Sequence, residues 1–463
     1  MNTLRQKYIG DKQFYKTVLR IVLPIAVQTG ITNLVNFLDN LMVGQLGTAA
    51  ISGVAITNQL IFCYNLAIFG GVAGAGIFTA QFYGAQDHEG IRNTIRFKFY
   101  VALAAFSAAL VLFLTCSDSL LNLFLNDTDT ASINATLAEG KGYLNIMIFG
   151  LLPFAFMQTL TSSLRECRET VLPMKSGILA VLVNLCLNYV LIFGHFGAPA
   201  MGVRGAALAT VISRYTEFLF IVIAVRLKRD KFPFFTGLLR TMRIPKNLAW
   251  RIIRKGTPLL CNELLWSVGM TMLVQSYSLR GLTVIGAFNI SNNVMNLFML
   301  VMMAGGNAIS IMVGQLLGAG KEKEAVDTDR KLIVFSILLS IGVGIILFAG
   351  AGIFPKLYNT EEEVRQTAAG FLRIMALVMP LDAVMNACYF TLRCGGKTII
   401  TFVFDSLFVI VVMLPIASLL VRLTDMSILL IYLIVQLTVA FKVVLGLILV
   451  KKGVWINNLT KES

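Results

Sequence analysis

Three carboxylates of this chain stand inside otherwise apolar stretches: Asp39, Glu263 and Asp382. None has a Lys or Arg three or four residues away, where a helix would place a neutralising partner. A charged side chain at the middle of a bilayer costs roughly 2.5–3.5 kcal/mol to insert, so such residues usually face a cavity, an ion path or a partner. A carboxylate in that setting binds an exchangeable proton or a hard monovalent cation. The three residues are therefore candidates for cation or proton coupling.

Polar side chains accompany Asp39 at helical spacing. Thr29, Thr32 and Asn36 precede it in steps of three and four residues, which predicts one polar stripe along an apolar helix. Oxygen-bearing side chains around a carboxylate suit a hard cation or a proton. The supporting polar residues expected near the coupling sites are Gln28, Asn36, Asn40, Asn184, Asn188 and Asn262.

Glu263 and Asp382 are predicted to lie at one depth. Glu263 follows the basic Arg251 by about 12 residues, and Asp382 precedes the basic Arg393 by about 11. At 1.5 Å per residue, both would lie ~17 Å from the same membrane surface. They can therefore share one site, at which Na⁺ is possible. The alternative is that each carboxyl is protonated and only hydrogen-bonds helices together.

Two further acidic residues are interpreted as structural. Glu217 lies three residues from Arg214, which is the spacing of a helical ion pair. Asp405 lies about one and a half turns into its helix. Arg214 and Arg373 are the only basic side chains expected deep enough to face a cavity.

The elements that must position these residues are membrane-spanning helices. The chain has 463 residues, 57% hydrophobic and 14% charged, whereas soluble domains carry about 25% charge. Apolar runs long enough for a ~20-residue spanning helix recur throughout. Twelve spans are predicted at 17–45, 51–82, 97–116, 142–164, 174–194, 205–227, 256–279, 284–317, 331–352, 366–392, 399–421 and 426–450.

The basic residues follow the topology. Most of the 39 Lys and Arg lie in the N-terminal segment, in alternate loops and in the tail, whereas the opposite loops carry Asp118, Asp127 and the run 361–363. The positive-inside rule then places both termini in the cytoplasm. This distribution excludes nucleic-acid binding. The polar first dozen residues lack a cleavable signal pattern, and the seven cysteines lack metal-binding or disulfide spacing.

The chain contains an internal repeat. At an offset of 234 positions Arg20 falls on Arg254, Pro24 on Pro258, Asn58 on Asn292, Gln81 on Gln315 and Gly84 on Gly318. We predict two homologous six-helix lobes, parallel to each other. The lobes are 1–227 and 256–463, joined by a basic cytoplasmic linker at 228–255. The apolar linker residues expected at the lipid surface are Phe232, Phe234, Phe235, Leu238, Leu239 and Met242.

Several strings together resemble the multidrug and toxic compound extrusion (MATE) transporters over essentially the whole chain. They are "FLDNLMVGQLG" (37–47), "AQFYGAQ" (80–86), "MGVRGAALATVIS" (201–213), "GQLLGAG" (314–320) and "LR" at 164–165 and 392–393. The resemblance implies cation-coupled export of amphipathic, often cationic compounds, with the family's helix 1 aspartate at Asp39. The NorM-like branch adds two acidic residues that match Glu263 and Asp382. The DinF-like branch typically has an aspartate where this chain has Asn188, so the match favours the NorM-like branch and Na⁺ over H⁺.

The expected function is thus secondary antiport by alternating access. No Walker loop is present for an ATP-driven pump, and the only histidines, His88 and His195, fall in predicted loops on opposite sides, which argues against an enzyme. The expected partners are small amphipathic substrates and membrane lipids. The protein is expected to be a plasma-membrane monomer with no cofactor beyond the coupling Na⁺ or H⁺. A flippase for lipid-linked oligosaccharides or peptidoglycan precursors is the alternative, and it would need a cationic cavity.

Overall fold

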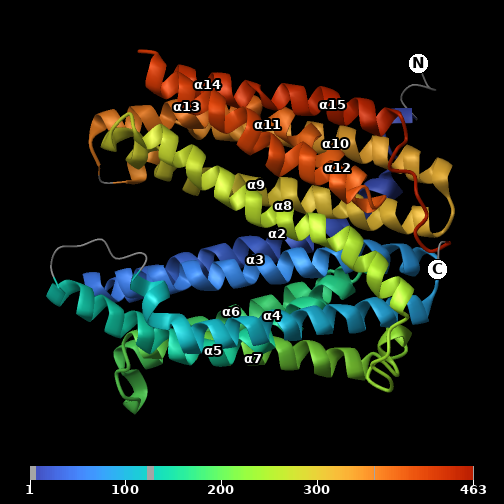
Figure 1. Cartoon of the computed structure of the whole chain (residues 1–463), viewed down its shortest axis with the longest axis horizontal. Coiled ribbons are helices and arrows are strands. Elements are labelled where there is room, and N and C mark those ends of the chain that lie inside the picture. Colours follow the sequence, from blue (N-terminus) through green and yellow to red (C-terminus); the bar gives the residue numbers. More distant parts are fainter. Residues whose placement is uncertain (1–6, 123–129, 359, 462–463) are drawn as a thin grey trace. The chain divides into compact units, whose positions relative to one another are not determined.

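The computed structural model of the chain describes residues 7–122, 130–358 and 360–461. Over this described part the chain is helical and contains no strand (Figure 1). Twelve helices of the described residues are long and apolar enough to cross a membrane. The predicted all-α class and the predicted number of spans are confirmed.

The twelve spans fall into two series of six. The first series is α2 (Lys12–Gly44), α3 (Thr48–Gly84), α4 (His88–Asn122), α5 (Thr130–Glu166), α6 (Val171–Phe193) and α7 (Val203–Leu227). The second begins with α8 (Lys246–Ser278), α9 (Leu282–Gly318), α10 (Glu322–Gly350) and α11 (Glu362–Cys394). Its fifth span joins α12 (Thr398–Phe402), the π-helical turns η4 (Val403–Leu407) and η5 (Val409–Met413), and α13 (Leu414–Leu423). Its sixth joins α14 (Ile428–Leu437) and α15 (Val439–Lys451), and the short 3₁₀ turns of the chain are η1 (His195–Gly197), η2 (Pro233–Phe235) and η3 (Phe354–Leu357).

The repeat is visible in the helix bounds. α2 and α8 each have 33 residues, and α3 and α9 each have 37. Both pairs begin and end 234 positions apart, which is the offset found in the sequence. The two halves therefore share helix lengths as well as scattered identities.

The chain divides into two compact units. The carboxy-terminal unit comprises Met1–Ala26, Ala80–Asp87 and Arg251–Ser463, and the amino-terminal unit comprises Val27–Thr79 and His88–Trp250. These units differ from the predicted lobes because two segments of the first half belong to the carboxy-terminal unit. The start of α2 joins its apolar core through four buried residues, Val18, Ile21, Val22 and Ile25.

The linker between the halves packs differently from the prediction. Phe232, Phe234 and Leu238 are buried rather than exposed to lipid. Phe234 stacks on His88 with ring centroids 6.5 Å apart, and the backbone oxygen of Leu238 accepts a hydrogen bond of 2.9 Å from Arg96 Nε of α4. Apolar linker residues thus fold back onto α4 within the amino-terminal unit, and the predicted lipid contact of these three is wrong.

The segment Ala80–Asp87 is tied to the carboxy-terminal unit by one side chain. Gln81 is fully buried and its Nε2 donates to the backbone oxygens of Cys394 at 3.0 Å and Asn457 at 3.1 Å. Its Oε1 accepts from the backbone nitrogen of Leu459 at 2.7 Å. Trp455 and Leu459 of the C-terminal tail are both 1% exposed. The tail after α15 is therefore a packed element of this unit.

Replacing Gln81 with Leu should loosen the C-terminal tail. The apolar side chain removes three hydrogen bonds at once, and each buried polar group that loses its partner costs about 1–3 kcal/mol. We expect the free energy of unfolding to fall by about 2 kcal/mol or more, and the backbone amide of Leu459 to exchange faster with deuterated solvent. The exposed Gln366, replaced by Leu, is the matched control. Unchanged exchange at residues 455–461 in the Gln81 variant would contradict the assignment.

Candidate functional site

Asp39 lies in a polar cluster of the amino-terminal unit. Nδ2 of Asn188, on α6, donates to Asp39 Oδ1 at 2.5 Å and is 3.1 Å from Asn184 Oδ1. Nδ2 of Asn184 lies 3.3 Å from Thr210 Oγ1 of α7. Asn184 and Asn188 are 4% and 1% exposed. The structure thus brings together the carboxylate and the two asparagines that the spacing singled out.

The amide of Asn184 has a second favourable orientation. Exchanging its oxygen and nitrogen places the nitrogen 2.9 Å from Asp39 Oδ1 and 3.1 Å from Oδ2. Asn188 Oδ1 is buried and has no hydrogen-bond partner among the described residues. Such an oxygen beside a carboxylate is a ready ligand for a cation. The cluster can therefore present amide hydrogens to an ionised Asp39 and amide oxygens to a bound ion.

The cation Arg214 is linked to this cluster through Tyr143. Tyr143 interacts electrostatically with both Asp39 and Arg214. Nη1 of Arg214 donates to the backbone oxygen of Gly150 at 3.3 Å, and its guanidinium carbon lies 4.9 Å from the ring centroid of Phe154. Arg214 is thus held by a carbonyl and an aromatic face on α5.

Glu217 interacts with two cations, Arg165 and Arg214. Among the charges acting on it, Arg165 contributes more than Arg214. Ser176 Oγ lies 3.5 Å from Glu217 Oε1. Arg165 Nη2 also donates to Gln28 Oε1 at 2.5 Å. The predicted interaction of Glu217 with Arg214 is therefore present, and the structure adds Arg165, which joins Glu217 to Gln28.

The other polar residues predicted on α2 behave in different ways. Gln28 is 9% exposed and belongs with Arg165, three turns from Asp39. Asn36 and Asn40 are exposed on the surface of the unit. The hydroxyl of Thr32 donates to the backbone oxygen of Gln28 at 2.9 Å. The contact with Asp39 described above comes from Asn188 of α6, not from these four residues of α2.

A second polar cluster lies inside the carboxy-terminal unit and is centred on Asp405. Lys442 Nζ of α15 donates to Asp405 Oδ1 at 3.1 Å, and Nδ2 of Asn262 on α8 donates to Oδ2 at 3.2 Å. Asn262 also accepts from Ser406 Oγ at 2.6 Å and lies 3.4 Å from the hydroxyl of Tyr389. Side chains of four spans meet here, and the predicted polar residue Asn262 is among them.

Glu263 and Asp382 are connected through this ion pair. Glu263 interacts electrostatically with Arg393 and with Asp405. Asp382 interacts electrostatically with Lys442. Each predicted coupling carboxylate of this unit thus interacts with one member of the Asp405–Lys442 pair. Within the described residues, no group of three or more His, Cys, Asp or Glu side chains is placed to hold a metal ion.

The sequence reading missed Lys442. It named Arg214 and Arg373 as the only deep basic side chains, and this is wrong because Lys442 is 4% exposed while Arg373 is exposed. Lys442 lies inside the predicted span 426–450, whose other residues are so apolar that one lysine leaves the hydropathy high. A search for single charges within each span would have found it.

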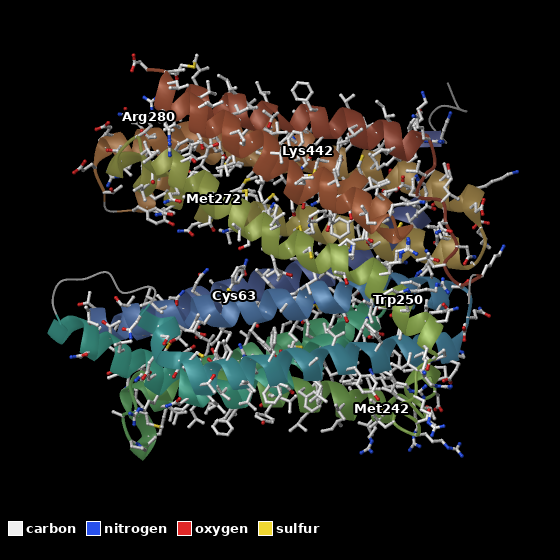
Figure 2. The ribbon with its side chains drawn as sticks, in the orientation of Figure 1. Cys63, Met242, Trp250, Met272, Arg280 and Lys442 are labelled. Carbon is white, nitrogen blue, oxygen red and sulfur yellow. The ribbon has the colours of Figure 1, made fainter. Side chains whose placement is uncertain are left out.

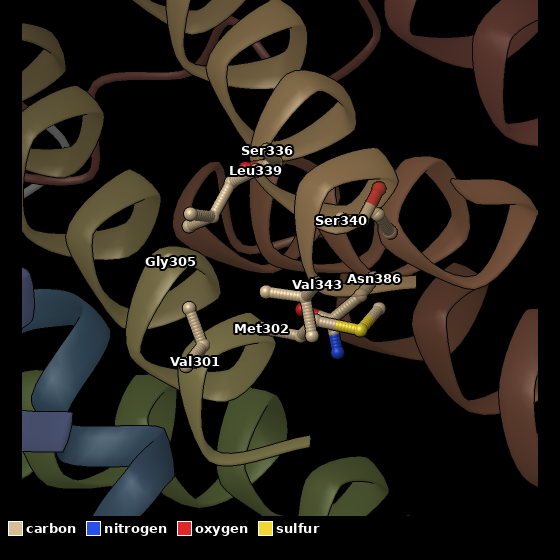
Figure 3. A pocket seen from close by; sticks show the side chains of 9 residues that line it. Val301, Met302, Gly305, Ser336, Leu339, Ser340, Val343 and Asn386 are labelled. Atoms are coloured by element: carbon tan, nitrogen blue, oxygen red, sulfur yellow. The ribbon is translucent and has the colours of Figure 1, made fainter. Parts of the chain in front are cut away.

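A small cavity lies between α9, α10 and α11 of the carboxy-terminal unit. Its volume of about 10 Å³ has room for about one water molecule. Figure 3 shows Ser336, Ser340 and Asn386 among the side chains that line it. Asn386, one turn after Asp382, has a buried Oδ1 without a hydrogen-bond partner in the described chain. Too small for an organic substrate, the cavity is a water-sized pocket with a mostly apolar lining.

Two related halves of long apolar helices, each with a carboxylate among polar side chains, are typical of a polytopic membrane transporter. The sequence pattern of the MatE family matches residues 24–190 and 259–421, one match in each half. The chain belongs to this family, the MATE transporters, as the resemblance predicted.

Proteins of two bacteria illustrate the relationship. The "Probable multidrug resistance protein NorM" of Thermotoga maritima is 26% identical over 95% of this chain and 93% of that protein. The "Probable multidrug resistance protein YoeA" of Bacillus subtilis is 25% identical over 93% and 92%.

Solved structures share the fold. A transporter of the MOP superfamily from Pyrococcus furiosus gives a TM-score of 0.84 at 18% identity, over 96% of this chain and 97% of that one. The outward-facing conformation of a multidrug resistance MATE family transporter gives 0.82 at 18% identity, over 96% and 98%. At this identity the likeness concerns the fold.

Proposed function

We propose that this protein is a secondary active antiporter that exports amphipathic, often cationic compounds in exchange for Na⁺ or H⁺ by alternating access. The observation that carries the proposal is the cluster of Asp39, Asn184 and Asn188. It combines one carboxylate, a 2.5 Å hydrogen bond to it and a buried amide oxygen without a hydrogen-bond partner among the described residues. The names of the multidrug resistance relatives support export of drugs or toxic compounds.

The energy balance of export explains why carboxylates that bind the coupling ion are needed. Ejecting a monovalent cation against ~100 mV costs ~2.3 kcal/mol, and one entering Na⁺ or H⁺ returns the same amount. The free energy that concentrates the substrate on the far side of the membrane must then come from the concentration gradient of the ion. Coupling requires that ion and substrate each weaken the binding of the other. Asp39 in one unit, and Glu263 and Asp382 in the other, are the groups proposed to bind the ion.

The proposal includes a location and an environment. It places the chain in the plasma membrane with both termini in the cytoplasm, because the basic residues gather in one set of loops. The protein acts as a monomer surrounded by lipid, and needs no cofactor beyond the coupling ion. Its partners are small molecules and lipids rather than nucleic acid.

The flippase alternative requires an unpaired cation for a pyrophosphate group. Of the two basic side chains considered for it, Arg373 is exposed, and Arg214 is held by the backbone oxygen of Gly150 and the ring of Phe154. Lys442, which the structure adds, is paired with Asp405. These contacts favour the antiporter.

Everted membrane vesicles test the function directly. A fluorescent cationic dye is added outside, and either an acid-inside or a Na⁺-inside gradient is imposed. We expect uptake of dye into the vesicles under at least one of the two gradients, and loss of uptake when an ionophore collapses it. Vesicles without the protein are the control. Absence of uptake under both gradients would rule out the proposed antiport for such dyes.

A further inference from the structure

Lys442 is a buried cation in the carboxy-terminal unit, where Glu263 and Asp382 were predicted to bind an ion. Figure 2 shows it among the helices of that unit. Its Nζ lies 3.1 Å from Asp405 Oδ1 and 5.6 Å from the ring centroids of both Phe404 and Phe408. An ammonium in apolar surroundings is stable there because one carboxylate and two aromatic faces replace its water.

The local backbone brings this lysine to Asp405. Gly446, one turn after Lys442, allows close approach: a Cβ there would lie 2.9 Å from Cys388 Cβ and 3.0 Å from Phe404 Cζ. Asp405 sits in the π-helical turn η4, a distortion frequently found at functional sites. α15 therefore lies against α11 and η4 with Lys442 on its inner side, while the adjacent Phe441 is 72% exposed.

The charges of this cluster can be counted. The carboxylates are Glu263, Asp382 and Asp405, and the cations interacting with them are Lys442 and Arg393. With all five ionised, three negative and two positive charges leave one net negative charge. The uncharged hydroxyl groups facing the cluster are those of Tyr389 and Tyr432. The fully buried Asp329 lies outside this count because it accepts from Thr391 at 2.5 Å and interacts with Arg330.

We propose that Lys442 is a tethered internal cation that limits the carboxy-terminal unit to one exchangeable monovalent cation. A buried cluster is most stable when its net charge is zero. Lys442 is paired with Asp405 at 3.1 Å, so one Na⁺ or one H⁺ completes the balance at Glu263 and Asp382. Without the lysine, the same carboxylates would bind two. The inference rests on the proposed function only for the exchange of that ion during transport.

Ion counting on the purified full-length protein tests the proposal. Asp39→Asn serves as the parent, because it removes the candidate coupling carboxylate of the amino-terminal unit. Bound ²²Na⁺ is measured by equilibrium dialysis at alkaline pH, and proton uptake is measured on the same samples after a pH jump. Relative to this parent, we expect Lys442→Gln to bind one more monovalent cation and Asp405→Asn to bind one fewer. The double variant, with Lys442→Gln and Asp405→Asn, should return to the parent count.

Controls keep the test decisive. Lys442→Arg preserves the charge and should match the parent. If Lys442→Gln fails to fold, the two other variants still test the proposal. The double variant should bind one more cation than Asp405→Asn. Equal counts in these variants would overturn the role of Lys442, even if the vesicles transport dye. If the number of bound cations shifts as predicted but the protein transports no dye, the role proposed for Lys442 stands and the antiport proposal is rejected.

Discussion

Asp39→Asn is expected to abolish ion-driven export of a cationic dye while leaving the protein folded. The asparagine oxygen can still accept the hydrogen bond that Asn188 donates at 2.5 Å, so the contact between α2 and α6 persists. The side chain can no longer ionise, so it neither takes up a proton nor offers a full negative charge to Na⁺. Coupling free energies of ~1–3 kcal/mol correspond to 5–150-fold effects, so the gradient-driven rate should fall by about tenfold or more.

The measurement is dye uptake by everted vesicles that contain equal amounts of the two proteins. Leu41→Ala is the matched control, because Leu41 is an exposed apolar residue close to Asp39 on the same helix. It should transport at close to the wild-type rate. Export by the Asp39 variant at the wild-type rate, under the gradient that drives the wild type, would remove Asp39 from the coupling mechanism.

The sequence predicted the helices and the Asp39 cluster for related physical reasons. Membrane spans are long and apolar, so composition alone finds them, and the duplicated lengths of α2 and α8 follow from the repeat. Asn184 and Asn188 share a helix face, since they are four residues apart. Their meeting with Asp39 depends on how α6 packs against α2, which the structure supplies through the 2.5 Å hydrogen bond.

The carboxy-terminal cluster was harder to predict because its pairing is between distant residues. Asp405 and Lys442 are 37 positions apart, and no helical spacing relates them. A rule that seeks neutralising partners only within one helix therefore treats Asp405 as alone. The same limit explains Glu217, whose stronger partner is Arg165 of another helix rather than Arg214 of its own. Pairing across helices is set by packing, which the residue pattern of one span does not encode.

The repeat places Gln81 and Gln315 at equivalent positions, and both belong to the carboxy-terminal unit. The side chain of Gln81 binds the backbone of the C-terminal tail. The offset in the sequence identifies the two glutamines, but it does not say which segment Gln81 binds, because that contact is set by packing.

Gly318→Val is expected to prevent the carboxy-terminal unit from folding normally, and Gly84→Val should do the same. A Cβ on Gly84 would lie 1.9 Å from the backbone oxygen of Gln315, and a Cβ on Gly318 would lie 1.9 Å from that of Gln81. The ends of α3 and α9 therefore touch backbone to backbone, through two contacts that the repeat makes equivalent. Overpacking costs about 1–3 kcal/mol where side chains can adjust, and more is expected here because backbone atoms must separate.

Thermal unfolding and size-exclusion chromatography of the detergent-purified protein measure this effect. For either valine variant, the monodisperse peak in size-exclusion chromatography should be much smaller than that of the wild type. Alanine at the same positions should lower the unfolding temperature. Gly342→Ala is the control, because a Cβ on that helical glycine of α10 would meet no atom within 4 Å. That change should be neutral or stabilising, since alanine favours a helix over glycine by about 1 kcal/mol. Wild-type stability of both valine variants would mean that the ends of α3 and α9 do not touch in the folded protein, and the strings "AQFYGAQ" and "GQLLGAG" would then need another explanation.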